Sequence, residues 1–403
     1  MQKKLVIVCL LNFLVAALMG LALRYSFIES IGVNYRFLTH AHSHVAMLGW
    51  MYLMLYTCIV HYFVPEQKPI YNRLFWLTQF AVIGMILSFP FQGYGAISIS
   101  FSTLHILCSY YFVYLIWKHH KATSKATTLL LKASLLFMLL STFGVWCLGP
   151  AVGMLGKASG FYQIAIQHFL HFQFNGWFIF AAVAVFFHLL HIKDSLLFRR
   201  FFKLLIVSTL LTLAMPIQWF VPNNILLVVN AFGVLLQLVA MFYFFKLTIQ
   251  PIRHLNKSSS PLLTYSLGFA IFSLAMKTIL QLVSIIPEFA ENIYLHRNFV
   301  IGFIHLLMLG VITGFLFVFI LKNELAVFNK TLDIGSFIFL LGFLSTEIII
   351  LIQGIKFYIG SGMLSNYHQI LFTSSILLPL GILLIIINIF KHKTHASQTT
   401  KTT

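Results

Sequence analysis

The strongest constraint on this chain is a series of long apolar runs separated by charged or Pro/Gly-rich breaks. A helix needs roughly 20 apolar residues to cross the hydrocarbon core of a bilayer. Only 8% of the residues are charged, about a third of the share in a soluble domain, so the chain cannot cover a water-facing surface. We therefore expect an all-α integral membrane protein with about twelve transmembrane helices. The expected spans are 5–23, 37–63, 71–89, 96–117, 128–148, 161–190, 203–220, 224–246, 262–286, 298–321, 333–356 and 368–390.

The two ends of the chain are polar and basic. The first run follows two lysines, as in a signal peptide, but it is longer than a signal-peptide core, so we expect a retained helix. We assign residues 1–390 to a single twelve-helix membrane domain. Residues 391–403 form a basic tail that we expect to be disordered and cytoplasmic. No internal repeat of the transporter kind stands out.

The net charge of +18 is best explained by topology. In a soluble protein such an excess would suggest nucleic acid as a partner. Here most of the 26 basic residues fall in the loops on the side of the N-terminus, whereas the other side keeps only Arg24, Arg36, Lys157, Arg297 and Lys356. Bases concentrate on the cytoplasmic side of membrane proteins. The pattern predicts cytoplasmic N- and C-termini and a multi-pass protein of the bacterial inner membrane, with the lipid bilayer as its partner and no nucleic acid.

The 17 histidines are the feature that most strongly suggests a function. Many lie at inner helix ends, where polar tips are ordinary. Seven others lie on four different spans in one outer layer, and most of them lie roughly 8–15 Å below the outer edge of the apolar core at 1.5 Å per helical residue. These are His40, His42, His44, His105, His168, His171 and His305. Ionisable residues inside a membrane mark functional sites, and imidazole is the commonest metal ligand, so we expect haem or metal ligation.

Two charged residues fall in the same layer, Lys277 and Glu347. Because a lone charge in the membrane is costly, we expect these two to pair, or one of them to contact a buried group such as a haem propionate. A carboxylate-bridged di-iron site needs several acids at this depth and is excluded. The four cysteines form no CxxCH motif, which argues against c-type haem.

The stretch HSHVAMLGWMYLMLYTCIVHYFVPEQ in the span 37–63 is similar to the large subunit of nitric-oxide reductases, within the superfamily of haem–copper oxidase subunit I. The resemblance extends to the number of spans and to histidines on the second, sixth and tenth of them. In that family a histidine of the second span ligates a low-spin haem. The spacing to the closing VPE favours His44 for this role, whereas the oxidase spacing leaves His42 as the alternative.

The other family positions are only partly kept. The stretch VIGFIHLLMLGVITGF resembles the family segment with two haem-ligating histidines, of which His305 matches the low-spin ligand and Phe303 replaces the high-spin ligand. His168 and His171 match the family's metal-ligating region, and His105 could join them in a second metal site of copper or non-haem iron. The adjacent metal-ligating histidines of the seventh span are replaced near Gln218.

The stretch HAHSHVAML also resembles the NnrS-type membrane proteins, which bind haem and copper and are similar in length. Together the resemblances imply one low-spin, bis-histidine b-type haem used for electron transfer or nitric-oxide-related redox chemistry. They also imply a quinol or cytochrome electron donor and oxidase-type partner subunits. Two alternatives stay open. One is a secondary transporter or channel that uses the polar layer, and the other is an unusual oxygen or nitric-oxide reductase with Gln218, Glu347 or Lys277 in place of lost ligands.

Overall fold

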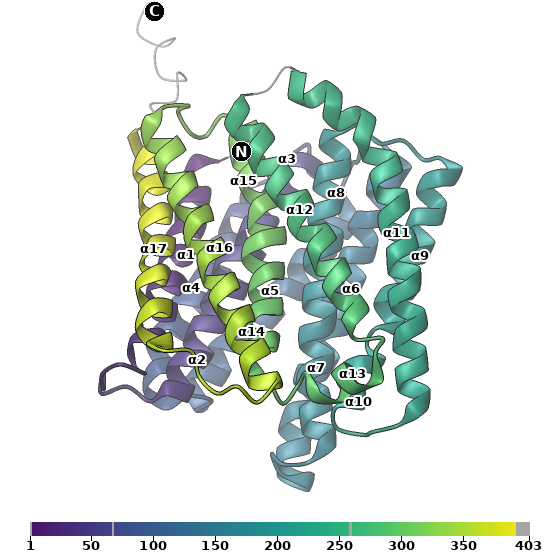
Figure 1. The fold of residues 1–403 in the computed structure, drawn as a ribbon. Coiled ribbons are helices and arrows are strands. Elements are labelled where there is room, and N and C mark those ends of the chain that lie inside the picture. The colour runs from purple at the N-terminus through teal and green to yellow at the C-terminus, as the bar shows by residue number, and fades with distance from the viewer. Residues whose placement is uncertain (1, 67, 258–259, 392–403) are drawn as a thin grey trace, which may run out of the picture.

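A computed structural model describes residues 2–66, 68–257 and 260–391 of the chain, and these residues form helices and no strand. Twelve helices are long and apolar enough to cross a membrane, as the sequence predicts. They alternate in direction, so that α1 begins and α17 ends at the same end of the bundle (Figure 1). We call this the Lys3 end, and the opposite one the Asn34 end. The predicted tail lies outside the described residues except for Lys391, which ends α17.

The twelve spans fall into three successive sets of four. The first set comprises α1 (Lys3–Tyr25), α2 (Tyr35–His44), η1 (Val45–Tyr52), α3 (Leu53–Phe63), α4 (Pro69–Gln92) and α5 (Ala96–His119). The second comprises α6 (Lys125–Leu155), α7 (Gly160–His171), η2 (Phe172–Phe178), α8 (Ile179–Leu189), α9 (Leu196–Leu211), α10 (Ala214–Gln218) and α11 (Asn224–Lys257). The third comprises α12 (Pro261–Val283), α13 (Pro287–Asn292), α14 (Arg297–His305), η3 (Leu306–Ile312), α15 (Thr313–Lys322), α16 (Lys330–Tyr358) and α17 (Tyr367–Lys391).

Several helices extend beyond the apolar runs that predict them. The run 128–148 becomes Lys125–Leu155, and the run 224–246 becomes Asn224–Lys257. The reason is that backbone hydrogen bonding continues into the polar flanks, where a hydropathy pattern no longer reports the helix. Ser124 and Asn329 mark two of the actual starts, because each side chain accepts a hydrogen bond from a backbone N–H of the first turn.

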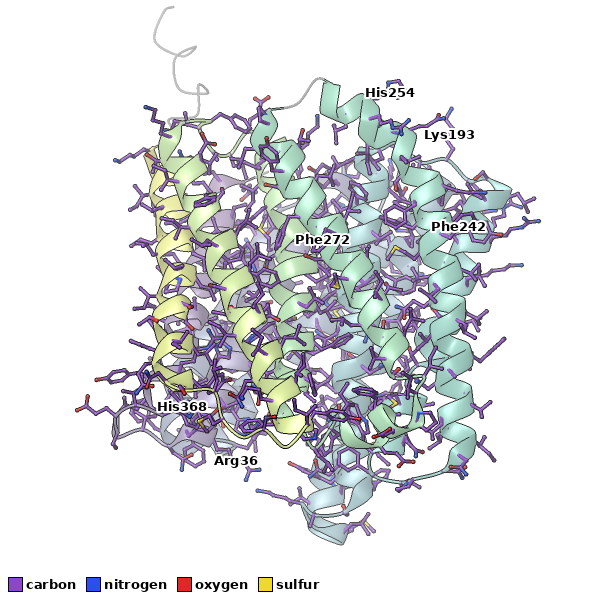
Figure 2. The ribbon with its side chains drawn as sticks, in the orientation of Figure 1. Arg36, Lys193, Phe242, His254, Phe272 and His368 are labelled. Carbon is purple, nitrogen blue, oxygen red and sulfur yellow. The ribbon has the colours of Figure 1, made fainter. Side chains whose placement is uncertain are left out.

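The second span of each set lies at the centre of the bundle. The most apolar windows of these three spans are 78%, 83% and 78% buried, whereas no other span exceeds 50%. The surrounding helices turn large apolar side chains outward, as Phe242 and Phe272 do near mid-height (Figure 2). This apolar outer surface suits a lipid bilayer.

The three central spans share a local pattern. In each, a histidine ends an α-helix and a π-helix follows, so His44 precedes η1, His171 precedes η2 and His305 precedes η3. The fifth residue after each histidine is a glycine that packs closely against the first helix of its own set. An added Cβ would lie 3.0 Å from Asn12 at Gly49, 2.6 Å from Phe137 at Gly176 and 2.8 Å from Ser273 at Gly310.

Two contacts between the central spans use equivalent positions. Trp50 of η1 donates its indole N–H to the hydroxyl of Thr313, at 2.9 Å. The corresponding pair between the second and first sets is Trp177 and Tyr52, whose rings lie 6.0 Å apart. The bundle is therefore a threefold repeat of four spans, and equivalent positions can be compared among the sets.

Candidate functional site

Packing around the central spans changes at the three histidines. No residue of α14 is buried, and in α2 only Leu38 and Ala41 are. Beyond His44 and His305, nearly every residue of η1 and η3 is buried. The central spans are thus loosely packed toward the Asn34 end and tightly packed toward the Lys3 end. The π-helices mark the boundary, and such segments are frequent at functional sites.

His42 and His305 are near enough to interact electrostatically. The Nδ1 atom of His42 lies 2.8 Å from the backbone carbonyl of Ala16 on α1, and because a carbonyl only accepts, Nδ1 is the protonated nitrogen. The imidazole fits closely against α1, since a Cβ added to Gly20 would lie 2.9 Å from its Cε1 atom. This arrangement leaves Nε2 of His42 as a nitrogen with a lone pair.

His305 lies beside an acid. Its Nδ1 atom is 3.5 Å from Oε1 of Glu347, within ion-pair range although neither atom has a hydrogen-bond partner. The guanidinium of Arg24 interacts electrostatically with Glu347 and donates a hydrogen bond to Ser375 of α17. His42, His305, Glu347 and Arg24, from four different spans, form what we call the His42–His305 cluster.

His44 faces away from this cluster. Residues two apart on a helix point in nearly opposite directions, because each residue turns the helix by about 100°. The Nδ1 atom of His44 donates to the carbonyl of His40 at 2.8 Å, and the ring packs against Phe89 with centroids 4.4 Å apart. The His40 ring lies 4.6 Å from that of Tyr94. His40 and His44 therefore face the helices of their own set.

The three predicted metal ligands do not converge. His105 packs against Tyr52, with ring centroids 4.6 Å apart, and its Nε2 atom has no partner. His171 directs Nε2 to the carbonyl of Thr209 at 2.7 Å. His168 faces α6, where a Cβ on Gly144 would lie 3.2 Å from its Nδ1 atom. Within the described part of the chain, no three His, Cys, Asp or Glu side chains are grouped to hold a metal ion.

The remaining polar positions have separate surroundings. Gln218 closes the turn before α11, because its side-chain oxygen accepts the backbone N–H of Asn223 at 2.7 Å. Lys277 is fully buried on α12, and its Nζ atom has no hydrogen-bond partner. The expected pair of Lys277 with Glu347 is not formed, because Glu347 lies beside His305 whereas Lys277 is close to His171.

Sequence reasoning missed three contributors to the cluster, Ala16, Gly20 and Arg24. The apolar run ends at residue 23 and predicts a loop position for Arg24, yet the helix extends to Tyr25 and carries Arg24 into the cluster. The backbone carbonyl of Ala16 accepts a hydrogen bond from His42, and Gly20 leaves room for the His42 ring because it has no side chain. No sequence pattern predicts either role.

Comparisons with known proteins add no relative. No family model matches the chain, and no curated protein shows significant similarity to it. Any functional inference therefore depends on the geometry of the site and on the short motifs described above.

Proposed function

We propose that this protein is a membrane haem protein that binds one low-spin b-type haem through His42 and His305 and uses it for electron transfer. The observation that carries the proposal is that these two imidazoles, on two central spans, lie within electrostatic range of each other, and that each has Nδ1 near an oxygen of its own surroundings. The Nε2 atoms of His42 and His305 would then be the nitrogens that hold a haem iron.

The surroundings of both imidazoles support ligation. Metal-ligating histidines almost always direct their second nitrogen to a carbonyl or a carboxylate, which fixes the ring and raises its basicity. The Ala16 carbonyl provides this acceptor for His42 at 2.8 Å. Glu347 faces Nδ1 of His305 at 3.5 Å, and a small ring rotation would bring it into hydrogen-bond range.

The packing supports a bulky group at this place. The side chains of His305 and Glu347 are 22% and 17% exposed although they lie on long apolar spans. None of the residues of α14 is buried, so the protein alone does not fill the space around this helix. A flat macrocycle beside α14 would bury these surfaces. The Arg24 guanidinium, which belongs to the same cluster, would supply a positive charge for a propionate of the bound haem.

The geometry supports His42, the alternative from the oxidase spacing, as the partner of His305. His42 interacts with His305, whereas His44 interacts with His40 and packs on Phe89. The reductase-like spacing that favours His44 counts residues along the chain, but the direction of a helical side chain changes by about 100° at each residue.

The bound haem would supply one-electron redox chemistry. The chain's own part is to hold both imidazoles in fixed orientations, to place Glu347 and Arg24 beside them and to keep the site within apolar helices. Phe303 cannot ligate iron, and Gln218 is occupied in a turn. These two residues favour electron transfer over reduction of oxygen or nitric oxide by a second metal centre. The proposal therefore assigns one haem and no second metal.

The proposal also covers location and partners. With most basic residues at the Lys3 end, this end would face the cytoplasm of a bacterial inner membrane. The His42–His305 cluster would then lie toward the outer side, where a quinol or a cytochrome could deliver electrons. Its resemblance to oxidase subunit I extends this proposal to oxidase-type partner subunits.

Optical spectroscopy of the purified protein tests the proposal. We expect a reduced-minus-oxidised difference spectrum with the α-band of a six-coordinate b-type haem, at one haem per chain. Replacing the ligand with His305→Ala should abolish or shift that band. A haem-free protein, or an unchanged band in the variant, would refute the function. Substrate flux that depends on Lys277 and Glu347 without bound haem would instead support a transporter.

A further inference from the structure

Lys277 has no counter-ion among the residues that the structure describes. All eight acidic residues lie in the described part, and none forms an ion pair with it. Seven of them lie in loops, in short α13 or in the first turn of α16, and the eighth, Glu347, is beside His305. Burying an ammonium group without a partner costs several kcal/mol. A fully buried Lys277 therefore needs a partner from outside the chain if it is to keep its charge.

Three neighbouring polar side chains also lack partners. Ser273 and Gln281 lie one turn on either side of Lys277 on α12, and the Ser273 hydroxyl and the Gln281 amide oxygen have no hydrogen bond. The side-chain amide of Asn230 on α11 donates to the hydroxyl of Ser284, the residue that follows α12, at 3.0 Å and fixes the register of these antiparallel helices. Gln237 lies two turns along α11 from Asn230, which places it level with Lys277, and its amide oxygen is also unpartnered.

The threefold repeat shows what the equivalent surface does in the first set. Ser273 packs on Gly310 as Asn12 packs on Gly49, so Lys277 and Gln281 are equivalent to Ala16 and Gly20. Ala16 and Gly20 are the two residues that seat His42. At the equivalent positions of the third set, α12 carries the ammonium of Lys277 and the amide of Gln281 instead. Lys277 is within electrostatic range of His171, the last residue of α7.

We infer that Lys277 is the centre of a binding site for a small monovalent anion, enclosed by α11, α12, η3 and α7. One negative charge balances the single ammonium. The Ser273 hydroxyl and the amide groups of Gln237 and Gln281 can rotate to donate to the anion. This inference goes beyond the proposed function, because the site lies apart from the His42–His305 cluster and needs no haem.

Anion-dependent stability tests the inference on the detergent-purified full chain. Thermal unfolding is measured in sodium bromide and in sodium nitrite, with sodium gluconate at equal ionic strength as the reference. Bromide and nitrite distinguish a halide from a planar oxyanion. We expect one or both to raise the unfolding midpoint in a saturable manner, because a ligand that binds only the folded state stabilises it. Equal midpoints in all three salts would overturn the inference.

Variants locate the site. Lys277→Met should abolish the anion-dependent shift, and Lys277→Arg should retain it. Gln237→Leu should weaken anion affinity about tenfold, the effect of losing one hydrogen bond to a charged group. Lys246→Met, on the exposed side of α11, is the matched control and should respond as the wild type does.

If the Lys277→Met protein does not fold, a direct measurement on the wild type takes its place. Crystals of the wild type soaked in bromide should then show an anomalous peak next to Nζ of Lys277. The absence of that peak, or an undiminished shift in a folded Lys277→Met protein, would overturn the site. Neither result depends on haem content, so failure of this inference is distinguishable from failure of the proposed function.

Discussion

At the scale of single residues, the direction of each imidazole decides its role more than its position in the sequence. His42 and His44 are two residues apart, yet one is bonded to Ala16 of α1 and the other to His40 of its own helix. Both hydrogen bonds leave Nε2 with a lone pair, but His305 acts electrostatically on His42, whereas His40 acts on His44. Ligation should therefore distinguish these two histidines.

The first prediction compares them directly. His42→Ala should lose most of the bound haem, because one of two axial ligands is removed, whereas His44→Ala should retain it. The haem content of each purified variant, measured as the pyridine haemochrome per chain, checks this. Haem loss in His44→Ala with full retention in His42→Ala would reverse the assignment.

A second prediction concerns the room for His42. In Gly20→Val the new Cβ would lie 2.9 Å from the His42 ring, so the imidazole must move and haem content should fall by at least half. Gly268→Val is a matched control on α12, since no atom lies within 4 Å of its added Cβ. Equal haem contents in both variants would show that Gly20 does not seat the ligand.

At the scale of elements, the three π-helices organise the centre of the bundle. Each follows a histidine and carries the glycine that admits the first helix of its set. Between the sets, the contacts are similar but not identical. Trp50 has a hydrogen-bond partner in Thr313, whereas the indole nitrogen of Trp177 has none.

This difference gives a third prediction. Trp50→Phe and Trp177→Phe remove similar volumes from fully buried sites, but only the first also breaks a hydrogen bond. Trp50→Phe should therefore be the more destabilising by about 1 kcal/mol. Denaturant unfolding in detergent compares the two free energies of unfolding. A larger loss in Trp177→Phe would indicate a partner for its indole nitrogen in the native protein.

The sequence predicts the elements well and the site only in part. The twelve spans follow from hydropathy because a bilayer permits few alternatives to long apolar helices. The π-helices and the threefold repeat were missed, although a glycine follows each of His44, His171 and His305 at the same spacing. Hydropathy gives the depth of each histidine in the membrane, and depth alone places these histidines in one group. The structure puts them in different surroundings because their side chains point in different directions, and depth does not report direction.

At the scale of the whole molecule, the distribution of charge follows the two ends of the bundle. Lys193 and His254 lie at the Lys3 end, and Arg36 and His368 lie at the Asn34 end (Figure 2). The Lys3 end is the more basic one, because most of the 26 basic residues lie in its loops. Because basic residues concentrate on the cytoplasmic side of membrane proteins, our proposal puts this end in the cytoplasm.

A fourth prediction tests this orientation. In a cysteine-free background, Arg36→Cys in intact cells should react with a membrane-impermeant maleimide, whereas Lys193→Cys should react only after the membrane is opened. The four native cysteines carry no predicted role, so their replacement leaves the site intact. Labelling of Lys193→Cys in intact cells would reverse the topology and place the His42–His305 cluster toward the cytoplasm.

The most direct test of the central claim is the electron paramagnetic resonance spectrum of the oxidised protein. Two imidazole ligands from His42 and His305 predict a low-spin ferric haem signal that integrates to one per chain and disappears or becomes high-spin in His305→Ala. A wild-type protein without a ferric haem signal, or with a high-spin signal alone, would contradict the account.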